Sequence, residues 1–152
     1  MTVGAITKVT RAVILDAARE WLGTSYVHQA SCLGVGCDCL GLVRGVWRSL
    51  YGREPEIMPN YSPDWAEAKR AETLFEAAAR WMVAVEPKAA KQGDVILFRW
   101  RKNLPAKHIA ILTDQTRFIH ACEGVPVSEV AFSGWWQRRV AYAFQFPCLI
   151  EE

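Results

Sequence analysis

Long apolar runs and a strong excess of charge are both missing from this 152-residue chain. No stretch approaches the roughly 18 apolar residues that a membrane-spanning helix requires. Five charged side chains within the first 23 residues interrupt any run of the length that a secretory signal needs. The net charge is only +2, whereas proteins that bind nucleic acid usually carry a stripe of basic residues. We therefore expect a soluble protein, made in the cytoplasm, with no membrane insertion and no nucleic acid as a partner.

Internal repeats, low-complexity tracts and long linkers are also lacking. The length is that of one ordinary domain, so we expect residues 1–152 to form a single domain. Five cysteines is an odd number, which argues against a scaffold held together only by disulfides. In a reducing compartment, thiols are more often buried, metal-bound or catalytic.

Two helices are predicted in the N-terminal third of the chain. Apolar residues recur at helical spacing from Thr10 to Leu22, with Thr10 placed to cap the start and Gly23 to end the helix. A glycine-containing loop follows, with a short extended piece at Ser25–Val27. A second helix is predicted to begin at Asp38–Cys39, where the Asp38 carboxylate is placed to accept a backbone N–H.

Gly41 and Gly45 lie four residues apart on one face of this second helix. Each glycine costs about 1 kcal/mol relative to alanine in a helix interior. We interpret this cost as a sign that another backbone segment packs closely against that face.

In the remainder of the chain, the spacing of the apolar residues changes from a helical to a strand-like pattern. A third helix, opened by Ser62-Pro63-Asp64, is expected to run to about Met82. Short β-branched and aromatic segments follow, broken by Gly, Pro, Asn and Asp, as is typical of antiparallel strands. These segments are Asp94–Trp100, Lys107–Thr113, Arg117–Ala121 and Val140–Phe146. Helices followed by strands predict an α+β fold.

Cys39 is the candidate nucleophile. A thiol in the first turn of a helix faces unpaired backbone N–H groups and the positive end of the helix dipole. Both favour the thiolate, which is the reactive form. On this segment alone, a small buried residue on the apolar stripe of the helix explains Cys39 equally well.

Two of the three histidines, His108 and His120, lie on consecutive predicted strands. If Thr113 pairs with Arg117, Ala110 faces His120, and His108 lies two residues along on the same face. A register shift of one residue would place the two histidines on opposite faces. The pattern therefore predicts, on this condition, an imidazole near the thiol and a second imidazole behind it.

The chemistry assigns a role to each group. A neutral His108 can take the proton of Cys39 as general base and later give it to the leaving amine. His120, bonded to the far ring nitrogen, would fix the tautomer and orientation of that base. Tyr26 precedes the cysteine by a short loop, and its hydroxyl could help the Cys39 backbone N–H to stabilise an oxyanion.

A metal site and a disulfide are alternative uses of the same cysteines. Cys32, Cys37 and Cys39 with His28 resemble a zinc cluster only poorly, because their spacing differs from paired C-x2-C knuckles, and we expect no metal and no cofactor. A Cys32–Cys37 disulfide is the remaining option for that pair.

Two further segments are rich in basic and aromatic residues. The first contains Arg99, Arg101, Lys102 and Lys107, which could recognise carboxylates of a peptide or lie in solvent. The second contains Trp135, Trp136, Arg138 and Arg139, which could contact a partner or, alternatively, fill the core and lie in solvent.

These motifs resemble, in order and spacing, those of the NlpC-type cell-wall cysteine peptidases, which are papain-like hydrolases that cut peptide stems of peptidoglycan, often between D-glutamate and diaminopimelate. The resemblance covers nearly the whole chain and implies Cys39 as nucleophile, His108 as base, His120 as its orienting group and Tyr26 as oxyanion helper. It also implies an antiparallel sheet packed on helices. The matching segments are Gly23-Thr24-Ser25-Tyr26, Asp38-Cys39-Leu40-Gly41-Leu42-Val43, Gly93-Asp94-Val95, Lys107-His108-Ile109-Ala110-Ile111 and Phe118-Ile119-His120-Ala121.

Finer features look like the short branch found in phage tail gene clusters and gene transfer agents, among them Val35-Gly36-Cys37, Leu97-Phe98-Arg99-Trp100-Arg101 and Gly134-Trp135-Trp136. Leu40 departs from the small serine usual in the family. We recognise no signal peptide or wall-binding repeat, so the resemblance implies a module that tail or baseplate proteins of a particle carry to the wall. A papain-like acyltransferase or thioesterase using His28, and a non-catalytic tail adaptor of the same fold, are the alternatives.

Overall fold

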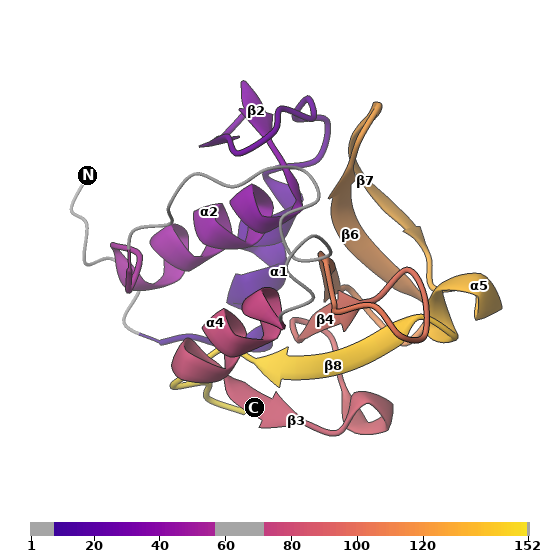
Figure 1. The fold of residues 1–152 in the computed structure, drawn as a ribbon. Helices are drawn as coiled ribbons and strands as arrows, with labels where there is room; N and C mark the ends of the chain where they lie inside the picture. The colour runs from indigo at the N-terminus through magenta and orange to yellow at the C-terminus, as the bar shows by residue number, and fades with distance from the viewer. Residues whose placement is uncertain (1–7, 57–71, 152) are drawn as a thin grey trace.

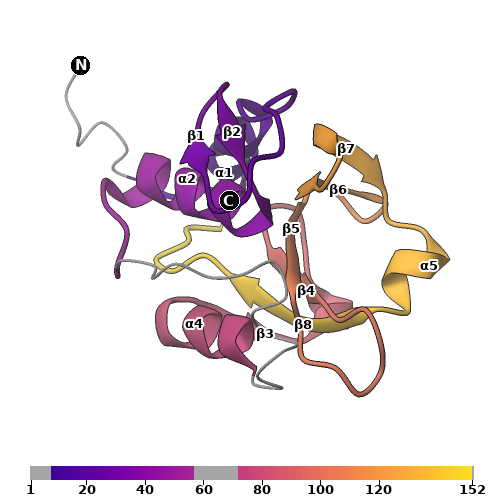
Figure 2. The same ribbon diagram turned by 45° about the horizontal axis from the view of Figure 1, so that its top comes forward.

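The computed structural model describes residues 8–56 and 72–151. Helices α1 and α2 and a small two-stranded sheet lie on one side of a six-stranded antiparallel sheet, whose strand order is β3-β8-β4-β5-β6-β7 (Figures 1 and 2). The α+β prediction is confirmed. The elements are α1 (Arg11–Arg19), β1 (Ser31–Cys32), β2 (Gly36–Cys37), α2 (Cys39–Tyr51), α4 (Thr73–Trp81), β3 (Val83–Val85), the 3₁₀ turn η2 (Pro87–Ala89), β4 (Val95–Phe98), β5 (His108–Leu112), β6 (Arg117–Cys122), β7 (Val125–Ala131), α5 (Gly134–Gln137) and β8 (Val140–Gln145).

The first helix begins as predicted but ends earlier. The Thr10 hydroxyl accepts a hydrogen bond from the Val13 N–H at 3.2 Å, which confirms the cap. The helix ends at Arg19 rather than Leu22, because the last turn tightens into bonds that span three residues. Gly23 has a φ of +87° and donates its N–H to the carbonyl of Val127, so it turns the chain toward β7.

The second helix begins at Cys39 with Asp38 as its cap, as predicted. One carboxylate oxygen of Asp38 accepts the Gly41 N–H at 2.7 Å. A Cβ at Gly41 would lie 1.9 Å from the carbonyl oxygen of Ala30, which confirms the close backbone approach at that position. At Gly45 the prediction was wrong, because the close neighbour is the indole of Trp21 rather than backbone.

All four predicted strands form, and no end differs from the prediction by more than two residues. The structure adds the two-residue strands β1 and β2, in the segment expected to be a loop, and the strands β3 and β7 of the large sheet. Pro126 and the polar Ser128 and Glu129 obscure β7, and as an edge strand it tolerates the proline. The third predicted helix is only partly confirmed: α4 begins at Thr73, and Glu72 precedes it with non-helical dihedral angles, φ −81° and ψ 55°. Its proposed start at Ser62-Pro63-Asp64 lies outside the described residues.

The predicted register of β5 and β6 is confirmed. Ile111 pairs with Ile119 and Leu112 with Phe118, and the Thr113 N–H donates to the Arg117 carbonyl at 3.0 Å. Side chains alternate between the two faces of the sheet. Ile109, Ile111 and Ile119 pack into the core with α1 and α2, whereas Ala110, Leu112 and Phe118 pack into a second cluster on the other face.

Candidate active site

Cys39 is the first residue of α2 and is half-buried at a cavity of about 300 Å³. The loop before α2, the start of β5 and the end of β6 form its walls. Three of the four predicted site residues, Tyr26, Cys39 and His108, line this cavity. The complete lining is Tyr26, His28, Asp38, Cys39, Leu40, Leu74, Trp100, Lys107, His108, Ala121, Cys122 and Glu123.

His108 and His120 are in direct contact. Nε2 of His108 lies 2.8 Å from Nδ1 of His120, and both side chains are about 5% exposed. The expectation that the two imidazoles share one face of the sheet is confirmed. His108, at the start of β5, reaches the cavity, while His120 lies behind it and does not line it. This leaves Nδ1 of His108 as the ring nitrogen not engaged by His120.

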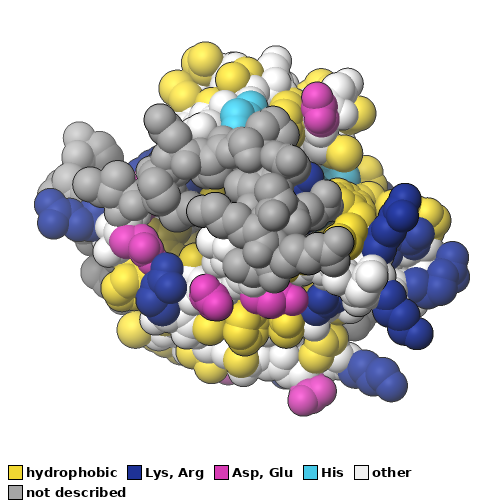
Figure 3. All heavy atoms as spheres, in the orientation of Figure 1, with side chains coloured by type: hydrophobic (Ala, Val, Ile, Leu, Met, Phe, Trp, Pro, Cys, Tyr) yellow, Lys and Arg dark blue, Asp and Glu magenta, His cyan; other side chains and the backbone are white. Residues whose placement is uncertain are grey.

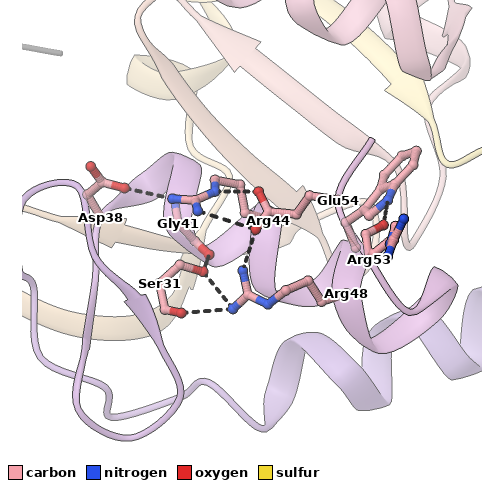
Figure 4. A network of polar contacts seen from close by, with 8 residues as sticks. Ser31, Asp38, Gly41, Arg44, Arg48, Arg53 and Glu54 are labelled. Atoms are coloured by element: carbon pink, nitrogen blue, oxygen red, sulfur yellow. Dashed lines mark hydrogen bonds and ion pairs between the residues drawn. The ribbon is translucent and has the colours of Figure 1, made fainter. Parts of the chain in front are cut away.

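The start of α2 is clamped to the preceding loop (Figure 4). Besides capping Gly41, Asp38 accepts the Gln29 N–H at 2.7 Å. The Ser31 hydroxyl donates to the Gly41 carbonyl at 2.6 Å, and Arg48 donates to both the carbonyl and the hydroxyl of Ser31. These bonds hold the loop against the first turn of α2, where Cys39 lies.

The charge state of Cys39 differs from the expectation that the helix start favours the thiolate. Burial, together with the neighbouring Asp38 carboxylate, raises the pKa of Cys39 to about 12, although backbone hydrogen bonds at Ile109 and Leu40 oppose the shift. The main physical reason is burial, which disfavours the charged thiolate. Asp38 adds to it, because its carboxylate occupies one of the free N–H groups of the first turn and places a negative charge there. The resting thiol is therefore protonated.

Both histidines are neutral at rest. Burial lowers the pKa of His108 to about 3, with a further lowering from His120, and burial lowers the pKa of His120 to about 4. The described residues place no carboxylate in hydrogen-bond contact with either ring. A neutral thiol and a neutral imidazole at one cavity require proton transfer to proceed together with nucleophilic attack.

Trp100 and Trp136 stack against His108, an arrangement that the sequence did not reveal. Their ring centroids lie 5.3 Å and 5.7 Å from that of His108, and 6.0 Å from each other. Trp136 also meets His120 edge-on at 5.3 Å. Indole faces attract a cation within about 6 Å. The two rings therefore favour the imidazolium that forms when His108 takes a proton.

Tyr26 lies at the cavity in an isolated bridge with Cys37. Burial, with a contribution from the charge of Cys39, raises the pKa of Tyr26 to about 12. Its hydroxyl therefore stays protonated at neutral pH and is available as a hydrogen-bond donor.

His28 also lines the cavity, with Nδ1 3.9 Å from a carboxylate oxygen of Asp38. All five cysteines have free thiols, so the Cys32–Cys37 disulfide is not formed in this structure. Among residues 8–56 and 72–151, no group of three or more His, Cys, Asp and Glu side chains is arranged to hold a metal ion. No helix of the described part is long and apolar enough to cross a membrane.

A thiol at a helix start and an imidazole at the start of an interior strand of an antiparallel sheet, both lining one cavity, form the layout of papain-like cysteine peptidases. The chain belongs to the NlpC/P60 family, whose model matches residues 23–143. None of the curated proteins compared with the chain matches it.

Solved structures share this fold. The NlpC/P60 domain of the peptidoglycan hydrolase SagA is 25% identical, with a TM-score of 0.64, over 91% of this chain and 100% of that one. An NlpC/P60 family protein from Bacillus cereus is 19% identical, with a TM-score of 0.68, over 93% of this chain and 41% of the other. A lipoprotein-like protein of the family from Staphylococcus aureus is 23% identical, with a TM-score of 0.60, over 95% and 44%. The chain spans less than half the length of these last two proteins.

Proposed function

We propose that this protein is a cysteine peptidase that hydrolyses peptide-stem bonds of bacterial peptidoglycan. The observation that carries the proposal is the meeting of Cys39 and His108 at one cavity, with His120 at 2.8 Å behind the base. Membership of the NlpC/P60 family supports the reaction class, and the similarity to a domain of SagA, a peptidoglycan hydrolase, supports the substrate class.

The reaction begins with a substrate carbonyl in the cavity. Nδ1 of His108 takes the thiol proton while the sulfur of Cys39 attacks the carbonyl carbon, and the carbonyl π electrons move onto its oxygen. The backbone N–H of Cys39 and the hydroxyl of Tyr26 donate hydrogen bonds to this oxyanion. The C–N bond then breaks as His108 returns the proton to the leaving amine. The acyl group is now a thioester on Cys39. Water, deprotonated by His108, attacks its carbonyl carbon, the C–S bond breaks to release the acid, and His108 returns the proton to the sulfur.

His120 acts on this cycle through His108. For Nδ1 of His108 to accept the thiol proton, Nε2 of the same ring must carry a hydrogen. That N–H then donates a hydrogen bond to Nδ1 of His120. This bond fixes both the tautomer and the plane of the ring. Because His120 is an imidazole and not a carboxylate, it adds no negative charge, and the tryptophan faces supply the attraction for the imidazolium.

We further propose that a phage-like tail or gene-transfer-agent particle carries the protein to the cell wall, with tail or baseplate proteins as its partners. The support is the resemblance of its finer motifs, such as Gly134-Trp135-Trp136, to that branch of the family. Proteomics of purified particles should find the chain at a fixed ratio to tail proteins. Its absence from intact particles would contradict this part of the proposal.

The reaction can be tested on purified muropeptides of defined sequence. Mass spectrometry should show products that together equal the substrate plus one water, and the masses identify the bond, which we expect to be that between D-glutamate and diaminopimelate. Cys39→Ala should abolish the reaction with an unchanged circular dichroism spectrum, whereas Cys32→Ala, at an exposed thiol outside the cavity, should keep it. Hydrolysis at the wild-type rate by Cys39→Ala would refute the proposal.

One observation favours a second candidate. His28 lines the same cavity and approaches Asp38, which is the arrangement that a papain-like acyltransferase or thioesterase with a different base would use. In that case His28→Ala would abolish activity and His108→Ala would spare it. The proposed peptidase requires the opposite result.

A further inference from the structure

A second depression adjoins the active-site cavity and is strongly basic. It has a volume of about 600 Å³, and we call it the basic cleft. Five of its seven lining residues are Arg or Lys and none is acidic, in a chain whose net charge is only +2. Figure 3 shows Lys and Arg side chains gathered on the right, the side on which α5 lies in Figure 1. The lining residues are Arg99, Trp100, Arg101, Lys102, Arg138, Arg139 and Val140.

The walls of the basic cleft come from two segments that are far apart in the sequence. The Arg99 N–H donates to the Arg139 carbonyl at 2.9 Å, where β4 and β8 meet at a bulge. The Arg99 side chain pairs with Glu72 at 3.2 Å and donates to the Leu104 carbonyl. Arg139 lies over the Trp135 ring at 3.7 Å. These two arginines are engaged within the protein and hold the cleft in shape.

The other three cations face solvent. Arg101, Lys102 and Arg138 are exposed, and within the described residues none of them forms an ion pair with a carboxylate. Three cations on one depression repel one another and favour an anionic ligand with several charges.

Trp100 joins the basic cleft to the catalytic cavity, because it lines both and stacks on His108. A peptide whose carbonyl lies at Cys39 and whose chain passes Trp100 enters the cleft within a few residues, since an extended chain advances about 3.4 Å per residue. The anionic groups that fit the cleft are therefore those of the substrate itself.

We propose that the basic cleft is a subsite for the free carboxylates of the stem peptide. This inference rests on the proposed function. A glutamate linked through its side chain keeps its α-carboxylate, and diaminopimelate carries a further carboxylate beyond its peptide bonds. Guanidinium groups bind carboxylates with two parallel hydrogen bonds, which gives them an orientation as well as affinity.

The test compares two substrates in two proteins. The substrates are a muropeptide with free stem carboxylates and the same muropeptide with those groups amidated. The proteins are the wild type and the triple variant Arg101→Gln/Lys102→Gln/Arg138→Gln. We expect the triple variant to raise KM for the carboxylate substrate roughly tenfold with little change in kcat. Its KM for the amidated substrate should stay at the wild-type value. Of the four combinations, added salt should raise KM only when the wild type acts on the carboxylate substrate.

The matched control is Arg53→Gln/Lys88→Gln/Lys91→Gln, which removes three exposed cations outside the basic cleft and should leave KM unchanged. Equal effects of the cleft variant on both substrates would overturn the inference. A second result would also overturn it: amidation of the substrate does not change KM, and a phosphate-bearing wall polymer or an oligonucleotide inhibits the wild type but not the triple variant. Failure of the proposed function is recognised separately, because the wild type would then cleave neither substrate.

Discussion

The thiol of Cys39 and the imidazole of His108 meet in a cavity that keeps both of them neutral at rest. Asp38, the residue that caps the helix, also disfavours the thiolate, because it supplies a negative charge near the sulfur. Reactivity in this site therefore depends on the transfer of a proton when substrate is present. A thiolate–imidazolium pair stored in the free protein is not needed.

Alkylation of Cys39 by iodoacetamide gives the first prediction. Because the pKa of Cys39 is raised to about 12, the thiolate fraction should rise about tenfold per pH unit through neutrality. The rate at the Cys39 peptide, followed by mass spectrometry, should climb to alkaline pH without a plateau. A rate that is high and constant from about pH 5 to pH 8 would show a preformed ion pair and contradict this description.

The two buried histidines predict a loss of stability in acid. Their pKa values in the folded protein, about 3 and about 4, lie below the ordinary value of 6.5, so the unfolded chain binds protons first as the pH falls. The stabilisation is complete above pH 6.5 and is lost as the pH falls to about 4 for His120 and to about 3 for His108. Urea unfolding should show a decrease of roughly 1.4 kcal/mol per pH unit for each histidine. His108→Gln/His120→Gln should flatten this dependence, whereas the same slope in that variant would exclude the two histidines as its cause.

At the scale of elements, the short helix α5 matters because it brings Trp136 against both histidines. Trp136→Leu removes an indole face from the imidazolium and should lower kcat roughly tenfold while moving the acidic limb of the pH–rate profile to lower pH. Trp136→Phe keeps an aromatic face and should retain most of the rate. If both variants shift the profile equally, the role of Trp136 is packing alone.

The close contact between α2 and the loop before it predicts the effect of Gly41→Ala. Alanine favours a helix by about 1 kcal/mol over glycine. Here its Cβ would meet the backbone oxygen of Ala30 at 1.9 Å, so the clash dominates and should cost at least about 1–3 kcal/mol. Thermal unfolding should show a lower Tm for Gly41→Ala. Ser49→Ala, at an exposed position of the same helix, should leave Tm equal or slightly higher; a stabilised Gly41→Ala would refute the contact.

Local rules predicted much of this architecture from the sequence. The caps at Thr10 and Asp38 follow from their short side chains, and the contact of His108 with His120 follows from a two-residue period and the length of one turn. The pKa of Cys39 could not be predicted, because it depends on burial by β5. Nor could the contact of Trp136 with His108, which joins distant segments and leaves no local pattern.

At the scale of the whole molecule, Arg11 ties the helical layer to the sheet and to the C-terminal segment. Its guanidinium contacts Asp94 at 2.8 Å, the Gln92 carbonyl at 2.9 Å and Glu151 at 2.8 Å. Asp94 is only 2% exposed. Loss of its cation leaves this buried carboxylate with no ion-pair partner among the residues that the structure describes, and with the Lys91 N–H still donating to it at 2.9 Å.

Arg11→Leu should therefore lower the free energy of unfolding by about 3 kcal/mol, as measured by denaturant titration. Glu151→Gln, which removes only the exposed carboxylate, should cost no more than about 1 kcal/mol. Similar losses in the two variants would mean that the Asp94 contact contributes little.

The two layers supply different parts of the proposed machinery: the helical layer holds the thiol, and the sheet holds both imidazoles. The most direct measurement of the central claim is the amount of soluble stem peptide that the protein releases from purified bacterial sacculi. Equal amounts of folded wild type, Cys39→Ala and His108→Ala should be compared. We predict release by the wild type and none above background by either variant. Release by Cys39→Ala at the wild-type level would contradict the claim.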